Sequence, residues 1–336
     1  MPDLTLILLG AVVLCALAFD FINGFHDTAN AIATSVLTRA LSIRNAVILS
    51  AAQNFLGAMI WTGVAATIGK GIVDPKLVIG HTGQILVLAA LLGAIIWNLI
   101  TWWKGLPSSS SHALIGAVIG AAIAARGVTV LNAHGLVKIL GWLIISPIIG
   151  FIAGAFLMIV VMNIFAQHAP SKLNKYFKVL QIISANFMAF THGSNDAQKS
   201  MGIITMALVV GGFLPSVTVP LWVKLSCAAA MALGTAGGGW RIIKTIGKKV
   251  IGLQPVHGFA SETAAAFVVL TATLFHAPVS TTHVVSSAIM GVGSAKRLTD
   301  VRWGIVRQIV TAWVMTLPIS AGLGAGCYIA LHFALR

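Results

Sequence analysis

Long apolar runs, separated by short polar or glycine-containing segments, follow one another along the 336 residues of the chain. A helix needs roughly 20 apolar residues to cross a bilayer, so the pattern predicts about ten membrane-embedded helical segments joined by short loops. Four of the runs are longer than one straight crossing requires, which predicts tilted, broken or re-entrant helices. The expected segments are 4–38, 44–69, 83–106, 109–125, 135–166, 178–209, 218–240, 257–276, 280–294 and 303–334. The predicted fold class is an all-α polytopic membrane protein.

The composition agrees with a membrane protein. Hydrophobic residues make up 58% of the chain and charged residues only 8%, whereas a soluble domain carries about 25% charged residues. This excludes a soluble enzyme, a disordered protein and a nucleic-acid module. The net charge of +14 does not change the picture, because the basic residues lie between apolar runs and not in one patch. The lipid bilayer is the expected environment, with no nucleic-acid partner.

The basic residues are distributed unevenly between the two sets of alternating loops. Thirteen of the Lys and Arg side chains fall in one set and four in the other. Because basic loops stay in the cytoplasm, we expect the richer set there and both termini on the other side of a plasma (inner) membrane. The richer set consists of Arg39, Arg44, Lys104, Lys172, Lys175, Lys178, Arg241, Lys244, Lys248, Lys249, Lys296, Arg297 and Arg302.

Two pairs of polar motifs indicate an internal duplication. The segment 23–31, around Asp27, matches 192–200, around Asp196, and the segment 107–112 matches 278–283. The two pairs have nearly the same offset along the chain, which chance does not explain. Each half then holds five segments, and an odd number makes the second half enter the membrane from the opposite side. We therefore expect two inverted-topology repeats, 1–166 and 178–336, joined by a cytoplasmic linker at 167–177.

The duplicated acidic residues, Asp27 and Asp196, lie within long apolar runs. A carboxylate in a membrane is costly unless it is paired, ion-bound or protonated, so both are candidates for binding Na⁺ or carrying H⁺. Gly24 and Gly193 would permit an unwound helix beside them, and amide oxygens nearby would complete a site for a hard cation. Those amides are Asn23, Asn30 and Asn195. The alternative is an Asp and Asn pair that only joins packed helices.

The other duplicated motif combines a helix start with several hydroxyl groups. Proline followed by serines or threonines predicts a helix N-terminus, where free N–H groups and hydroxyls form an anion site. Two such starts, related by inversion, could hold a tetrahedral oxyanion between them. The candidate ligands are Ser108, Ser109, Ser110, Ser111, Ser280, Thr281 and Thr282. The alternative is ordinary N-capping with hydroxyl bonds between helices.

Three neutral polar residues lie next to these motifs. His112 and His283 follow the hydroxyl motifs and are either proton-linked groups behind the site or packing histidines. Gln198, within one turn of Asp196, is a candidate anion ligand.

Two further charged residues lie in apolar segments. Lys199 could pair with a carboxylate or attract an anion, although Asn30 stands at its repeat-related position. Glu262 is expected to be functional or paired with a cation such as Arg241 or Lys244.

These motifs resemble those of the PiT inorganic phosphate transporter family. The resemblance rests on the two Asp motifs, the two Ser/Thr-His breaks and the segments 239–245 and 258–262. It implies an inverted-repeat carrier that takes up inorganic phosphate with Na⁺ or H⁺. Asp27, Asn30, Asn195 and Asp196 would then serve coupling ions and substrate, with Asp27 and Asp196 as metal ligands if the ion is Na⁺. The hydroxyls of 108–111 and 280–282 would hold phosphate.

One departure from the family pattern favours a proton. Phe25 and His26 stand where the family usually has Ala and Asn, and a histidine beside Asp27 favours H⁺ over Na⁺. Compact bacterial members of the family also resemble sulfate permeases, so sulfate is the alternative substrate. No cofactor is expected other than a coupling ion, and a homodimer is a further hypothesis.

A remote alternative is an intramembrane hydrolase with Ser110 or Ser111 as nucleophile and His112 as base. Neighbouring residues on a helix do not face each other, and one catalytic site gives no reason for a duplication. The sequence therefore predicts a transporter and not an enzyme.

Overall fold

The computed structural model describes residues 2–168, 170–237 and 252–335, which are almost entirely helical and contain no strand. The first half of the chain comprises α1 (Pro2–Leu37), α2 (Ile43–Ala58), α3 (Gly63–Gly71), η1 (Pro75–Leu77), α4 (His81–Lys104), α5 (Ser110–Arg126), η2 (Val128–Val130) and α6 (Ala133–Ile164). The second half comprises α7 (Pro170–Val210), α8 (Leu221–Gly237), α10 (Pro255–Leu274), α11 (Thr281–Lys296), η3 (Leu298–Asp300) and α12 (Trp303–Ala334).

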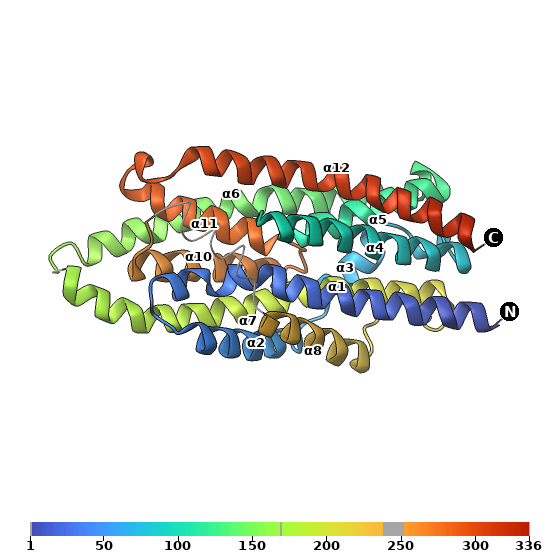
Figure 1. Cartoon of the computed structure of the whole chain (residues 1–336), viewed down its shortest axis with the longest axis horizontal. Coiled ribbons are helices and arrows are strands. Elements are labelled where there is room, and N and C mark those ends of the chain that lie inside the picture. Colours follow the sequence, from blue (N-terminus) through green and yellow to red (C-terminus); the bar gives the residue numbers. More distant parts are fainter. Residues whose placement is uncertain (1, 169, 238–251, 336) are drawn as a thin grey trace.

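The two halves have inverted topology. Along the long axis of the molecule α1 and α7 run in opposite directions, as do α6 and α12, and the two termini lie at the same end (Figure 1). A third pair of matching residues supports the duplication, because Pro147 inside α6 and Pro318 inside α12 have the same offset as the hydroxyl motifs. The predicted fold of inverted helical repeats is confirmed.

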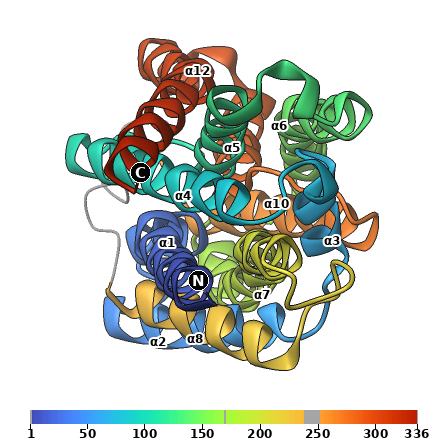
Figure 2. The ribbon, with the colours of Figure 1, turned by 90° about the vertical axis from the view of Figure 1, so that its right-hand side faces the viewer.

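The halves interlock instead of standing side by side. α1 packs against α8 and α2 against α7, while α5 packs against α12 and α6 against α11. In the view along the long axis, α1 and α7 lie together, with α2 and α8 on one side and α4 and α10 on the other (Figure 2). The middle of the molecule is thus built from equivalent elements of both repeats.

Two helical hairpins reach the centre of the bundle from opposite ends. α4 runs inward and α5 returns to the same end, and α10 and α11 do the same from the other end (Figure 1). Their tips touch, since the Ser111 hydroxyl donates to the carbonyl of Val279 at 3.1 Å. Segments 109–125 and 280–294 are therefore the outgoing arms of hairpins and not full crossings.

The long helices α1 and α7 are continuous through Asp27 and Asp196, so the expected unwinding at Gly24 and Gly193 is wrong. Both glycines instead allow helices to touch. A Cβ on Gly24 would collide with the backbone carbonyl of Met231, and one on Gly193 with that of Asn54. Close backbone approach at small residues is a common way of packing helices in membranes.

Fewer helices than expected have the length and composition of a single straight span. Within the described residues these are α1, α4, α6 and α12, although α4 ends at the hairpin tip in the centre of the bundle (Figure 1). The expected segment 44–69 is bent by 71° between α2 and α3. α7 begins at Pro170, so most of the range expected to be a linker is helical.

Candidate functional site

The site lies where the middle of α1 and α7 meets the tips of the two hairpins. On the α1 side, the Asp27 carboxylate is 1% exposed and accepts a long hydrogen bond of 3.4 Å from the Ser110 hydroxyl. Its other oxygen lies 2.7 Å from Nδ1 of His26. A helix start of the first hairpin is thereby attached to a buried acid of the same repeat.

The α7 side repeats this arrangement. Asp196 is also 1% exposed, and its Oδ2 accepts a hydrogen bond of 3.1 Å from the Thr281 hydroxyl. Its Oδ1 lies 2.6 Å from Nζ of Lys199. Ser110 and Thr281 are repeat-related positions, so the two acids hold the two helix starts in equivalent ways.

A second pair of equivalent contacts crosses between the repeats. The Asn30 amide donates to the hydroxyl of Thr282 at 2.9 Å, and the Lys199 ammonium donates to that of Ser111 at 2.5 Å. Lys199 also donates to the carbonyl of Val279 at 2.9 Å. Each long helix therefore contacts both hairpin tips, and the structure brings the predicted carboxylates and hydroxyls into one cluster.

The remaining hydroxyls of the two motifs form hydrogen bonds within their own hairpins. Ser109 and Ser280 are the N-caps of α5 and α11 and accept hydrogen bonds from the backbone N–H groups of His112 and His283, at 3.1 and 3.2 Å. Ser108 donates to Thr101 at 2.8 Å. Capping thus explains the Ser109 and Ser280 hydroxyls, whereas those of Ser110, Ser111, Thr281 and Thr282 face the acids and their neighbours.

The histidines that follow the motifs lie against each other. The rings of His112 and His283 have centroids 4.5 Å apart, and His283 stacks on Trp313 at 4.0 Å. The Trp313 indole donates to the carbonyl of Pro107 at 3.0 Å. This aromatic stack fixes the two helix starts relative to each other behind the hydroxyl groups.

The expected amide ligands have different surroundings. Asn195 holds the tip of the second hairpin, because it donates to the Thr273 hydroxyl at 3.0 Å and the Ala277 carbonyl at 3.2 Å. Asn23 and Asn30 are buried, and the Oδ1 atom of each has no hydrogen-bond partner among the described residues. Buried acceptors without a partner are unusual in proteins, so these two oxygens are the better candidates for a cation.

Sequence reasoning missed a further candidate cation ligand, His192. One ligand atom each from Asp27, His192 and Asp196 lie within 4.8 Å of one another, and all three residues are buried. The other ring nitrogen of His192 is 2.9 Å from the Asn54 side-chain oxygen, which orients the ring. The sequence signal for His192 was its place directly before Gly193 in the second Asp motif. Asn23 stands at the repeat-related position, so the histidine is not part of the duplicated pattern.

Gln198 lies next to the cluster but faces another element. Its side-chain oxygen accepts hydrogen bonds from the backbone N–H groups of Val64 and Ala65, at 2.8 and 3.3 Å. Its amide group donates to the carbonyl of Ser194. Gln198 therefore caps the start of α3, and its role as an anion ligand stays a prediction.

Glu262 belongs to a separate buried cluster between α1, α7 and α10. Its carboxylate accepts hydrogen bonds from Ser184 at 2.5 Å, from Gln181 at 3.4 Å and from Thr34. These partners are all neutral, and the suggested cations Arg241 and Lys244 lie outside the described residues. The carboxylate is thus solvated by hydroxyl and amide groups within the described part of the chain.

Sequence reasoning also missed a buried acid on α1. Asp20 is fully buried on α1 and accepts a hydrogen bond of 2.7 Å from the Ser200 hydroxyl on α7. It lies two turns before Asp27 on the same helix. Ala189 occupies the repeat-related position, so a search for duplicated motifs could not find it.

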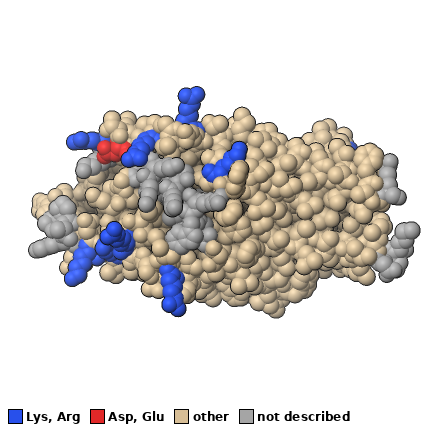
Figure 3. All heavy atoms as spheres, in the orientation of Figure 1, with Lys and Arg blue, Asp and Glu red and all other residues tan. Residues whose placement is uncertain are grey.

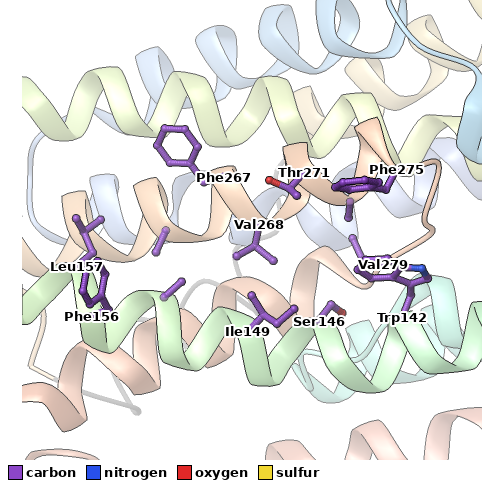
Figure 4. A pocket seen from close by; sticks show the side chains of 13 residues that line it. Trp142, Ser146, Ile149, Phe156, Leu157, Phe267, Val268, Thr271, Phe275 and Val279 are labelled. Carbon is purple, nitrogen blue, oxygen red and sulfur yellow. The ribbon is translucent and has the colours of Figure 1, made fainter.

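A cavity between α6 and α10 adjoins the polar cluster at Val279. Figure 4 shows its lining, which includes Trp142, Ile149, Phe156, Phe267 and Val268. The described lining is mostly apolar, with Trp142, Ser146 and Thr271 as its donor side chains, and includes no charged group, so the cavity is unsuited to a small anion.

The comparisons with known proteins agree with this architecture. The chain matches the model of the phosphate transporter family twice, over residues 23–172 and 165–324. It is 54% identical to a probable low-affinity inorganic phosphate transporter of Bacillus subtilis over 98% of the chain and 99% of that protein. A protein of Rhizobium meliloti with the same description is 47% identical over 96% of both chains.

A solved structure has the same fold. The structure described as the sodium-dependent phosphate transporter superposes with a TM-score of 0.86 at 25% identity, covering 97% of this chain and 99% of that one. The proteins named in these comparisons are transporters and not enzymes, which removes the hydrolase alternative. With matches over both repeats and full-length relatives, this multi-pass membrane protein belongs to the phosphate transporter family.

Proposed function

We propose that this protein is a secondary transporter that imports inorganic phosphate together with a coupling cation by alternating access. The observation that carries the proposal is the twofold pattern in which Ser110 contacts Asp27 and Thr281 contacts Asp196. In this pattern, hydroxyls that can donate to an anion lie next to carboxylates that can bind a cation, in two inverted copies near the middle of the bundle. The descriptions of the relatives as phosphate transporters support the same substrate.

The chemistry of the cluster explains why anion and cation would travel together. Hydroxyls at two helix N-termini can donate to the oxygens of a tetrahedral anion. The same anion would be repelled by the buried Asp27 carboxylate, with which no described lysine or arginine pairs, unless a cation or proton neutralises it. Binding of the anion therefore requires the cation, which is the condition for symport.

Phosphate fits the cluster better than sulfate does. Both anions are tetrahedral, but phosphate at neutral pH still carries a proton and can donate a hydrogen bond to a carboxylate such as Asp27. Sulfate has no proton to donate and would leave that carboxylate facing an oxyanion. His26, which lies against Asp27, favours H⁺ as the coupling ion.

Charge on the surface supports the expected orientation. Most of the Lys and Arg side chains visible in Figure 3 lie in the half of the molecule away from the two termini. The exposed residues there include Arg39, Arg44, Arg297 and Arg302. We propose that this end faces the cytoplasm and that both termini lie outside the inner membrane.

Uptake into proteoliposomes tests the function directly. Labelled phosphate should accumulate under an imposed pH or Na⁺ gradient, and sulfate should compete weakly. Ser110→Ala or Thr281→Val should raise the KM for phosphate about 10-fold, since each removes a hydrogen bond to a charged group. Ser226→Ala, a hydroxyl on α8 outside the cluster, is the matched control and should leave the KM unchanged. Accumulation of sulfate in place of phosphate, or of neither anion, would refute the proposal.

A further inference from the structure

The ammonium group of Lys199 sits among three oxygen atoms in the middle of the site. Its Nζ lies 2.6 Å from Asp196 Oδ1, 2.5 Å from the Ser111 hydroxyl and 2.9 Å from the carbonyl of Val279. The Lys199 side chain is 2% exposed. A carboxylate, a hydroxyl and a backbone carbonyl are also the ligand types that a hard monovalent cation takes in transporters.

These contacts use the full donor capacity of the lysine. An ammonium group has three N–H donors and no acceptor, and three acceptors surround this one. None is left for an oxygen of a bound anion. The geometry therefore makes Lys199 a partner of Asp196 and not an anion ligand in this state.

The first repeat has no lysine at the matching place. Asn30 occupies the position equivalent to Lys199 and makes the equivalent contact, to Thr282. Its oxygen Oδ1 has no hydrogen-bond partner among the described residues. Asp27 contacts only His26 and Ser110 through the described hydrogen bonds, so no described lysine or arginine forms an ion pair with it.

We propose that Lys199 is a built-in substitute for a coupling cation in the second repeat. Its ammonium neutralises Asp196 in every cycle, so that only the Asp27 half takes up a mobile cation, Na⁺ or H⁺, with each phosphate. This inference rests on the proposed function and concerns the number of coupling ions. It predicts that the two repeats make equivalent contacts at the site but that one coupling cation, and not two, accompanies each phosphate.

The decisive variant replaces the lysine with its repeat-related residue. Lys199→Asn leaves Asp196 buried without a cation and adds an amide oxygen in place of the ammonium. We expect phosphate uptake to fall at least about 10-fold in Na⁺-free buffer, because an unpaired buried charge opposes anion binding. High Na⁺ should restore most of this uptake, and each phosphate should then carry one more positive charge into the vesicle than in the wild type.

Lys199→Met is the matched control, because methionine fills similar space but offers no oxygen to a cation. Its uptake should stay low at every Na⁺ concentration. Thermal unfolding in detergent without phosphate gives a readout that does not depend on transport. Na⁺ should raise the Tm of Lys199→Asn relative to choline and leave the Tm of Lys199→Met unchanged.

The outcomes separate this inference from the proposed function. If the wild type transports no phosphate, the proposed function fails. If the wild type transports phosphate but Lys199→Asn shows no Na⁺ rescue and no Na⁺-dependent Tm, the substitute role is wrong. A wild-type uptake rate that rises with the second power of cation concentration would also overturn it, whether or not the variants fold.

Discussion

Replacing Asp196 should destabilise the protein much more than replacing Asp27, although the two acids are repeat-related. Asp196→Asn leaves the buried Lys199 ammonium without the carboxylate 2.6 Å away. Breaking a buried ion pair by removing one partner costs about 3–5 kcal/mol. Asp27→Asn leaves no described lysine or arginine unpaired and weakens the contact with His26 and the long bond from Ser110, so we expect a loss of about 1–2 kcal/mol.

A double-mutant cycle isolates the interaction energy of the Asp196–Lys199 pair. Lys199→Met alone should cost a similar amount to Asp196→Asn alone, because it leaves the carboxylate unpaired. The double variant should be more stable than the sum of the two losses predicts, by about 3 kcal/mol, since no buried charge is then left over. Unfolding in detergent, followed by tryptophan fluorescence and circular dichroism, measures all four proteins. The claim that Asp196 and Lys199 stabilise each other would be refuted by losses that add within about 0.5 kcal/mol. An Asp196→Asn protein as stable as Asp27→Asn would refute it as well.

Three further predictions concern packing, capping and the second acidic cluster. Gly193→Ala should lower the free energy of unfolding by at least about 2 kcal/mol, because its Cβ meets backbone atoms of α2; Gly141→Ala, with open space around it, should cost nothing in the same unfolding assay. Gln198→Ala should cost about 1–2 kcal/mol through the lost cap of α3 and leave the KM for phosphate unchanged; a KM rise at full stability would instead assign it to the anion. Glu262→Gln should keep stability within about 1 kcal/mol, since no described cation loses a partner, but should change the Na⁺ or pH dependence of uptake; an unchanged dependence would remove Glu262 from coupling.

The duplication and the inverted topology were predictable because they are written in the chain itself. Two pairs of polar motifs at nearly one offset, each within an apolar run, have few explanations other than repeated helical units. The number of segments per half then determines their relative orientation. Span ends and the form of segments 109–125 and 280–294 were not predictable, since an apolar helix of this length suits a hairpin arm as well as a crossing.

The role of the two glycines depended on a partner that local sequence does not contain. A glycine beside a buried acid permits either an unwound helix or a close helix contact. Which one forms at Gly24 depends on Met231, which lies on α8 in the other repeat.

The hydroxyls within each motif have different roles, because successive residues at a helix start point in different directions. One serine of each motif caps its helix, the next residue contacts the acid, and the one after it contacts Lys199 or Asn30.

The residues missed by sequence reasoning, His192 and Asp20, have no matching residue in the other repeat. This is a consequence of how a duplicated transporter can diverge. The contacts from Ser110 to Asp27 and from Thr281 to Asp196 stay equivalent because both hold the hairpin tips. Around them the charges differ between the repeats, as at positions 30 and 199. Symmetry therefore identifies the framework that we propose for anion binding, while departures from symmetry are the places to look for the residues that set ion coupling.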